Sequence, residues 1–296
     1  MKRKNVVYFL AAACIAGVIG GCGSTSGSGS SDSSKWQEMG EVIPITRENG
    51  SGTRSSFAEA LGLNIEGVDD QDEITESAQT ETSGEDMLRA VAGEKNGIGY
   101  VTYSTDLQEG DGAKEITIDG QKAEDETIEE DSYPLTRTLY LAHTSEDKDL
   151  ETDFINYVTG KGQETVSEFF VPIGGKEVFL SNQASGTLKI HGSTTLAPVI
   201  EQLADDYEKE NSNAQIEVEV SDSSKGITDV LTGKCDIAMV SRQLYQYETE
   251  VLEAEAVAKD GIRVIVNEKN PTEDISMDTL EKIYTGKISK WENTQE

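Results

Sequence analysis

Hydrophobic and polar positions follow two alternating patterns along the chain. Short apolar runs such as GIGYVTY (97–103), CDIAMV (235–240) and IRVIVN (262–267) predict buried strands. Other stretches carry apolar residues at helical spacing, for example TTLAPVIEQLADDY (194–207) and SMDTLEKIY (276–284). Strands and helices that alternate in this way predict an α/β fold.

Residues with small or hydroxyl side chains precede three of the predicted helices. They occur in RENGSGTRSSF (47–57), HGSTT (191–195) and SDSSKGI (221–227), and Ser241 and Arg242 directly follow the predicted strand CDIAMV. Each motif alone is typical of an ordinary helix N-cap. Free N–H groups and the positive end of the helix dipole also attract anions, and ligands collect beyond the carboxyl ends of strands. Together with Arg47, the motifs predict several helix N-termini that converge on one oxyanion.

The first residues have the features of an export signal. Lys2, Arg3 and Lys4 precede an apolar run that ends in IGGC, which resembles the bacterial lipobox. We expect a signal peptide over residues 1–21, a lipid on Cys22, and a flexible Gly/Ser linker through residue 35. The protein is therefore expected outside the cell membrane, anchored to its outer face.

Charge and cysteine content narrow the classes of function. A formal net charge of −31 makes nucleic acid and anionic lipid poor partners. The acidic stretches 69–85 and 124–131 are interpreted as solvated loops. Once Cys14 and Cys22 are set aside, Cys235 has no partner for a disulfide and is expected to be an inert core thiol.

The sequence gives little support to catalysis. His143 and His191 lack metal-ligand spacing, and neither a phosphate-binding P-loop nor a G-x-S-x-G nucleophile elbow is present. We expect no metal, no cofactor and no catalytic residue, although an extracytoplasmic phosphoesterase built on Asp and Ser stays open.

Taken as a set, GSTTLAP, SDSSKGI, CDIAMVSR, IYTGKISKW, RENGSGT and GIGYV resemble the landmarks of PstS-type phosphate-binding proteins, which feed bacterial ABC phosphate importers. The resemblance implies a two-lobed periplasmic-binding-protein type II fold with the ligand cleft between the lobes. The ligand-contacting positions that it implies are Arg47, Ser51, Gly52, Thr53, Thr194, Thr195, Ser223, Ser241 and Arg242.

The order of the landmarks differs from that of the family. The half from about Trp36 to Leu180, which normally comes second, stands first here, and the joint Ser181–Thr187 leads into the other half. We therefore expect a circularly permuted chain, with lobe I formed by residues 135–266 and lobe II by residues 36–134 and 267–296. The hinge is expected near Tyr133–Arg137 and Val266–Pro271. Half-modules that pair between chains are the alternative.

The expected function is delivery of inorganic phosphate to the permease subunits of an ABC importer by a monomeric receptor. Binding or sensing of another oxyanion such as sulfate, molybdate or arsenate is the alternative. Arg242 and Asn49 stand where the best-known family members carry Asp. Arg242 can face the ligand, pair with a carboxylate such as Glu48, or face solvent.

Overall fold

The computed structural model describes residues 32–65, 68, 70–144, 148–175 and 178–295. The expected signal peptide, the lipidated Cys22 and the linker up to residue 31 lie outside the described residues. Among the helices in the described ranges, none is both long and apolar enough to cross a membrane.

One mixed sheet runs through the molecule, in the order β2-β1-β3-β11-β6-β10-β8-β9, with β4 and β7 paired to β11. A second, two-stranded sheet joins β12 and β5. This mixture of strands and helices confirms the expected α/β class. The strands are β1 (Ile43–Arg47), β2 (Gln79–Glu81), β3 (Gly97–Thr102), β4 (Ala113–Glu115), β5 (Thr117–Ile118), β6 (Thr136–His143), β7 (Val171–Pro172), β8 (Gly186–Ser193), β9 (Ala214–Ser221), β10 (Ile237–Val240), β11 (Glu253–Asn267) and β12 (Asp274–Ile275).

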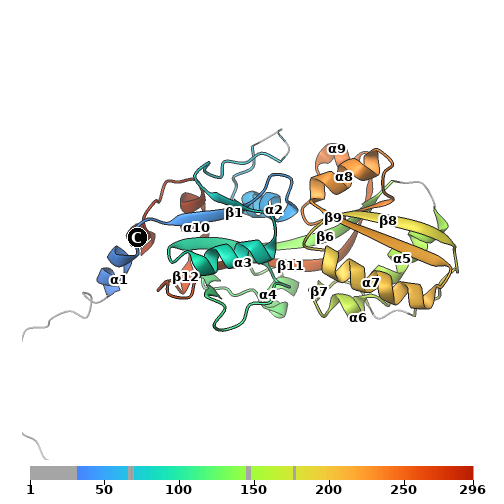
Figure 1. The fold of residues 1–296 in the computed structure, drawn as a ribbon, viewed down its shortest axis with the longest axis horizontal. Helices are drawn as coiled ribbons and strands as arrows, with labels where there is room; N and C mark the ends of the chain where they lie inside the picture. The colour runs from blue at the N-terminus through green and yellow to red at the C-terminus, as the bar shows by residue number, and fades with distance from the viewer. Residues whose placement is uncertain (1–31, 66–67, 69, 145–147, 176–177, 296) are drawn as a thin grey trace, which may run out of the picture.

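Figure 1 shows two bodies joined by β6 and β11, which confirms a two-lobed molecule. We call them the α2 lobe and the α7 lobe after the helix of each that borders the cleft. The helices of the α2 lobe are α1 (Asp32–Met39), α2 (Gly52–Ala60), α3 (Gly84–Gly93), α4 (Asp125–Glu129), α10 (Met277–Tyr284) and the 3-10 helix η1 (Trp291–Gln295). Those of the α7 lobe are α5 (Asp149–Thr159), α6 (Gln163–Val166), α7 (Ala197–Glu210), α8 (Ser223–Leu231) and α9 (Gln246–Thr249).

Each lobe has its own buried core. In the α2 lobe, Phe57 stacks on Tyr100 with ring centroids 4.0 Å apart, and its edge meets Tyr284 at 4.7 Å. In the α7 lobe, Phe154 packs edge-on against Tyr207 at 5.3 Å, within a cluster that includes Leu203. Aromatic packing of this kind buries large apolar areas and fixes the helices on the sheet.

Strand β11 is the main link between the lobes. Its residues 253–261 pair with β6, whereas residues 262–266 pair with β3. Ile262, Val264 and Val266 pack in the core of the α2 lobe. The passage between the lobes therefore lies at Gly261–Ile262, ahead of the expected boundary at 266, because β11 changes its pairing partner there from β6 to β3.

Two further segments differ from the expectations. Helix α1 begins at Asp32, inside the range expected to be flexible linker, because Trp36 and Met39 pack against the core of the α2 lobe. The acidic stretch 124–131 contains helix α4, whose Ile128 is fully buried, so it is not a loop. Cys235 is buried as expected, and burial raises the pKa of its thiol to about 12.

Candidate functional site

Helix α2 begins at the motif RENGSGT. Ser51 is its N-cap, and the Ser51 hydroxyl accepts a hydrogen bond from the Arg54 backbone N–H at 3.4 Å. Ser51, Gly52 and Thr53 are buried although they stand at the end of a helix. The first turn of α2 therefore points into the molecule, where its free N–H groups face the other lobe.

The turn before α7 meets the first turn of α2 across the cleft. The hydroxyls of Thr53 and Thr195 lie 3.0 Å apart. Thr195 N–H donates to the Ser193 hydroxyl at 3.1 Å, which fixes the turn before α7. Thr194, the neighbouring residue, is reached from the α2 lobe by Arg47 Nη2 at 3.3 Å. The structure thus brings the GSTT and RENGSGT motifs together.

Three serine side chains of the α7 lobe form a buried cluster, which we call the serine triad. The Ser193 hydroxyl donates to the Ser241 hydroxyl at 2.9 Å, and the hydroxyls of Ser223 and Ser241 lie 3.3 Å apart. Ser241 N–H also donates to the Ser223 hydroxyl at 3.1 Å. This arrangement unites the end of β10, the start of α8 and the end of β8.

Gly52 is pressed against the serine triad. A Cβ atom at this position would lie 2.4 Å from Ser223 Oγ, 2.5 Å from Ser241 Oγ and 2.9 Å from the Ser241 carbonyl carbon. Only glycine permits such a close approach. The lobes are therefore closed on each other at this point, with the backbone of α2 in contact with the triad.

Arg47 is buried at the end of β1 and is held by several acceptors. Its Nε and Nη2 donate to the two carboxylate oxygens of Glu48, both at 2.8 Å, in a bidentate pair. Nη2 also reaches the Thr82 carbonyl at 3.0 Å. Such contacts fix the guanidinium plane. Glu48 thereby places a carboxylate directly against the guanidinium group of Arg47.

Arg242 is 2 % exposed, so it does not face solvent, and it pairs with Glu248 rather than Glu48. Its Nη1 and Nη2 donate to the Glu248 carboxylate at 2.7 and 2.9 Å, and Nη2 also reaches the Ser224 hydroxyl. Burial opposes the charge, but Glu248 outweighs it and raises the pKa of Arg242. Its buried Nε makes no hydrogen bond among the described residues, but it forms a longer ion pair with Asp70 Oδ1 at 3.9 Å.

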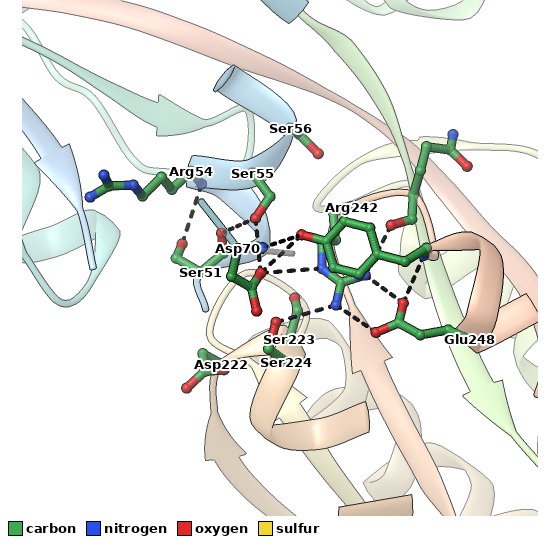
Figure 2. A network of polar contacts seen from close by, with 12 residues as sticks. Ser51, Arg54, Ser55, Ser56, Asp70, Asp222, Ser223, Ser224, Arg242 and Glu248 are labelled. Carbon is green, nitrogen blue, oxygen red and sulfur yellow. Dashed lines mark hydrogen bonds and ion pairs between the residues drawn. The ribbon is translucent and has the colours of Figure 1, made fainter. Parts of the chain in front are cut away.

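A second contact across the cleft lies beside Arg242, whose guanidinium carbon stands 4.0 Å from the centroid of the Tyr245 ring. The Tyr245 hydroxyl donates to Asp70 Oδ1 and accepts from Asp70 N–H, both at 3.0 Å. Figure 2 shows Arg242 and Glu248 beside Ser223 and Ser224, with Asp70 approaching from the α2 lobe. Asp70 therefore does not lie in a solvated loop, as its acidic stretch had suggested.

Sequence reasoning missed two donors near the site. Ser56 Oγ and Arg137 Nη1 donate to the carbonyl oxygen of Ser241 at 3.1 and 2.9 Å. Ser56 follows Gly52 by one helical turn, so helical periodicity would have placed it on the same face. Arg137 gave no such signal, because a single arginine in a strand carries no motif.

A cavity of about 700 Å³ lies in the cleft between the lobes. Residues from both lobes line it, including Arg47, Thr53, Thr194, Thr195 and Tyr100. Arg47 and the threonine hydroxyls bring hydrogen-bond donors to one side of the cavity, which suits an oxyanion, whereas Glu85, Asp106 and Glu201 line other parts of it. The cleft therefore has the chemistry of an anion-binding site.

Outside the cleft, one group of described residues has the spacing of metal ligands: His191, Glu219 and Asp229. Asp229 already pairs with His191 and with the ammonium groups of Lys225 and Lys234. Two lysines on one carboxylate oppose the binding of a cation, so we assign no metal to this group.

Comparison with known proteins yields a consistent set of similarities. A family model described as "PBP superfamily domain" matches residues 25–161 and 178–296. The phosphate-binding protein PstS 2 of Streptococcus pneumoniae (strain TIGR4) is 35% identical over 296 residues, which cover 99% of each chain. The phosphate-binding protein PstS of Bacillus subtilis (strain 168) is 35% identical over 114 residues, which cover 37% of each chain.

The fold is also similar to that of a solved structure. The crystal structure of a phosphate ABC transporter, phosphate-binding protein from Streptococcus pneumoniae TIGR4 superposes with a TM-score of 0.72 at 36% sequence identity. The superposition covers 86% of this chain and 100% of that chain. The similarity therefore extends over both lobes and the cleft.

Proposed function

The chain belongs to the PBP superfamily, and on this premise we propose that it binds inorganic phosphate in its cleft and delivers it to an ABC importer as a solute-binding protein without catalytic activity. One observation carries the proposal. The first turn of α2, the turn before α7 and the serine triad meet in one closed cleft, beside the buried Arg47. The names of the relatives, all phosphate-binding proteins, agree with this chemistry.

We propose that the phosphate oxygens contact hydroxyl and N–H donors from both lobes. The proposed contacts are Arg47, Ser51, Gly52, Thr53, Thr194, Thr195, Ser223 and Ser241, with Arg242 contributing through Nε. Two observations support the role of Arg242: its other two guanidinium nitrogens are bonded to Glu248, and its buried Nε makes no hydrogen bond among the described residues, since Asp70 Oδ1 lies beyond hydrogen-bond distance at 3.9 Å. A buried unpaired donor is costly unless an acceptor arrives.

We further propose that Cys22 carries a lipid and holds the receptor at the outer face of the cell membrane. The motif IGGC and the Gly/Ser stretch that follows it support this proposal. The tether would enter the α2 lobe through α1. It would hold the receptor at the membrane that also contains the permease subunits to which phosphate is delivered.

We also propose that the chain is monomeric and circularly permuted relative to PstS-type proteins such as that of Bacillus subtilis, in an order that it shares with PstS 2 of Streptococcus pneumoniae, which aligns over 99% of both chains. The two ends of the folded part lie together, since Glu41 bridges to Lys290 and Trp291 N–H donates to the Gly40 carbonyl at 3.1 Å. A collinear alignment can follow only one half of a permuted pair, in keeping with the partial match to the Bacillus subtilis protein.

Relinking tests the permutation. A variant that joins Glu296 to Trp36 through a short Gly/Ser linker and opens the chain between Gln183 and Ala184 should fold as a monomer. Termini that lie close together tolerate such a change. The affinity of the relinked variant for phosphate, measured by calorimetry, should stay within about threefold of wild type. A relinked protein that is folded only as a dimer would favour halves that pair between chains.

Calorimetric titration of residues 32–296 tests the proposed function. We expect one phosphate per monomer, and affinity that rises between roughly pH 6 and 8, where phosphate loses its second proton, because the proposed contacts are donors. Sulfate, arsenate and molybdate are the comparison ligands. Preference for one of them over phosphate would point to another oxyanion, and turnover of p-nitrophenyl phosphate would point to a phosphoesterase.

A further inference from the structure

The carbonyl oxygen of Ser241 receives hydrogen bonds from both lobes. Ser56 Oγ donates from α2 at 3.1 Å, and Arg137 Nη1 donates from β6 at 2.9 Å. All three residues are buried. This oxygen belongs to the serine triad residue at the end of β10, so its position affects both closure of the cleft and the geometry of the site.

Arg137 is anchored at the passage between the lobes. It pairs directly with Asp260 across the antiparallel strands β6 and β11. Its Nε and Nη2 donate to Asp260 Oδ2 at 2.8 and 2.6 Å, and the two side chains are 5% and 0% exposed. Burial lowers the pKa of Arg137, whereas Asp260 acts in the opposite direction and holds the charged form.

Asp260 is in turn bonded to the other lobe. The Thr102 hydroxyl lies 2.9 and 2.8 Å from its two carboxylate oxygens, and Tyr103 N–H donates to Oδ1 at 2.9 Å. Both donors stand at the end of β3 in the α2 lobe. A continuous chain of buried polar contacts thus leads from β3 through Asp260 and Arg137 to Ser241.

We infer that Arg137 is a positioning residue of the phosphate site, which fixes the Ser241 carbonyl from the hinge and through it the serine triad. The inference rests on the proposed function. Holding this carbonyl fixes the backbone torsion after Ser241, and with it the direction of the chain toward Arg242. Because Ser56 binds the same oxygen from the opposite lobe, a correctly placed carbonyl also favours the closed cleft.

Arg137→Lys separates this role from simple stabilisation. A lysine ammonium can keep the ion pair with Asp260, but it lacks the rigid fork that reaches Asp260 and Ser241 together. We expect about tenfold weaker phosphate binding by calorimetry, the size typical of one lost charge-assisted hydrogen bond. The melting temperature without phosphate should change little, because the buried carboxylate stays paired.

Arg263→Lys is the matched control. Arg263 lies on the same strand as Asp260, faces Glu115 at 3.8 Å and Tyr103, and has no contact with Ser241. Its affinity for phosphate should stay within about twofold of wild type. A combined Ser56→Ala and Arg137→Lys variant should show non-additive losses, since both donors share one oxygen.

The outcomes are distinct. If wild type binds phosphate and Arg137→Lys binds equally well, the inference is wrong and Arg137 only stabilises the hinge. If Arg137→Lys fails to fold, the phosphate affinities of Ser56→Ala and Asp260→Asn provide the test instead. Wild-type affinity in both variants would likewise overturn the inference. Wild type that binds no phosphate would overturn the proposed function instead, whatever the variants do.

Discussion

A Gly52→Ala variant is expected to bind phosphate about thirty- to hundredfold more weakly than wild type while folding normally. The added methyl group would overlap Ser223 Oγ and Ser241 Oγ at 2.4 and 2.5 Å. Rotation of the two serines would relieve those overlaps only by breaking the triad. The third contact, 2.9 Å to the Ser241 carbonyl carbon, is with backbone and cannot move aside.

The free energy of this overlap destabilises only the closed cleft, since Gly52 and the serine triad belong to opposite lobes. Overpacking of this kind typically costs about 1–3 kcal/mol, and each 1.4 kcal/mol is about tenfold in affinity. Opening of the lobes relieves the clash, so the melting temperature without phosphate should be nearly unchanged. Calorimetry and thermal unfolding measured together distinguish this from global damage.

Gly93→Ala is the control for this prediction. Gly93 also lies in a helix, at the end of α3, and a Cβ there would meet nothing within 4 Å. Both its affinity and its stability should match wild type. Affinity of Gly52→Ala within threefold of wild type would show that α2 does not approach the triad when phosphate is bound.

Much of the site could be predicted from sequence because it consists of local motifs. An N-cap followed by a helix specifies its own geometry, so Ser51 with α2 follows directly from RENGSGT, and Thr194 and Thr195 before α7 from GSTT. The two-lobed fold followed from the resemblance. These predictions required only that each motif keep the structure it has in isolation.

The partners of the buried arginines could not be predicted, because tertiary structure decides them. Arg242 finds Glu248 only because α9 turns back after β10, and Arg137 meets Asp260 only through the register of two strands far apart in sequence. The length of β11 could not be predicted from the sequence either. Its apolar run was visible, but its passage between lobes depends on which strand pairs with each half.

Arg47→Ala is expected to weaken phosphate binding at least about thirtyfold, or roughly 2 kcal/mol or more. Arg47 is 4% exposed and lies at the cleft, where its Nη2 contacts Thr194 of the opposite lobe. Because Nε and Nη2 are bonded to Glu48, we expect Nη1 to contact phosphate, and its loss would leave a desolvated anion short of a charge-assisted donor. Glu48 is 25% exposed and can be hydrated, so the fold should persist.

Two further variants test whether the effect depends on the guanidinium geometry of Arg47 or only on a positive charge near the cavity. Arg47→Lys keeps the charge without the fork, and it should recover only part of the affinity. Arg89→Ala removes an arginine that lines the same cavity but is 72% exposed and pairs only with Asp86 among the described residues, so its affinity should stay within about twofold of wild type. Equal affinities of Arg47→Ala and wild type would show that the anion binds away from Arg47. The helix N-termini and the serine triad would then provide the site by themselves.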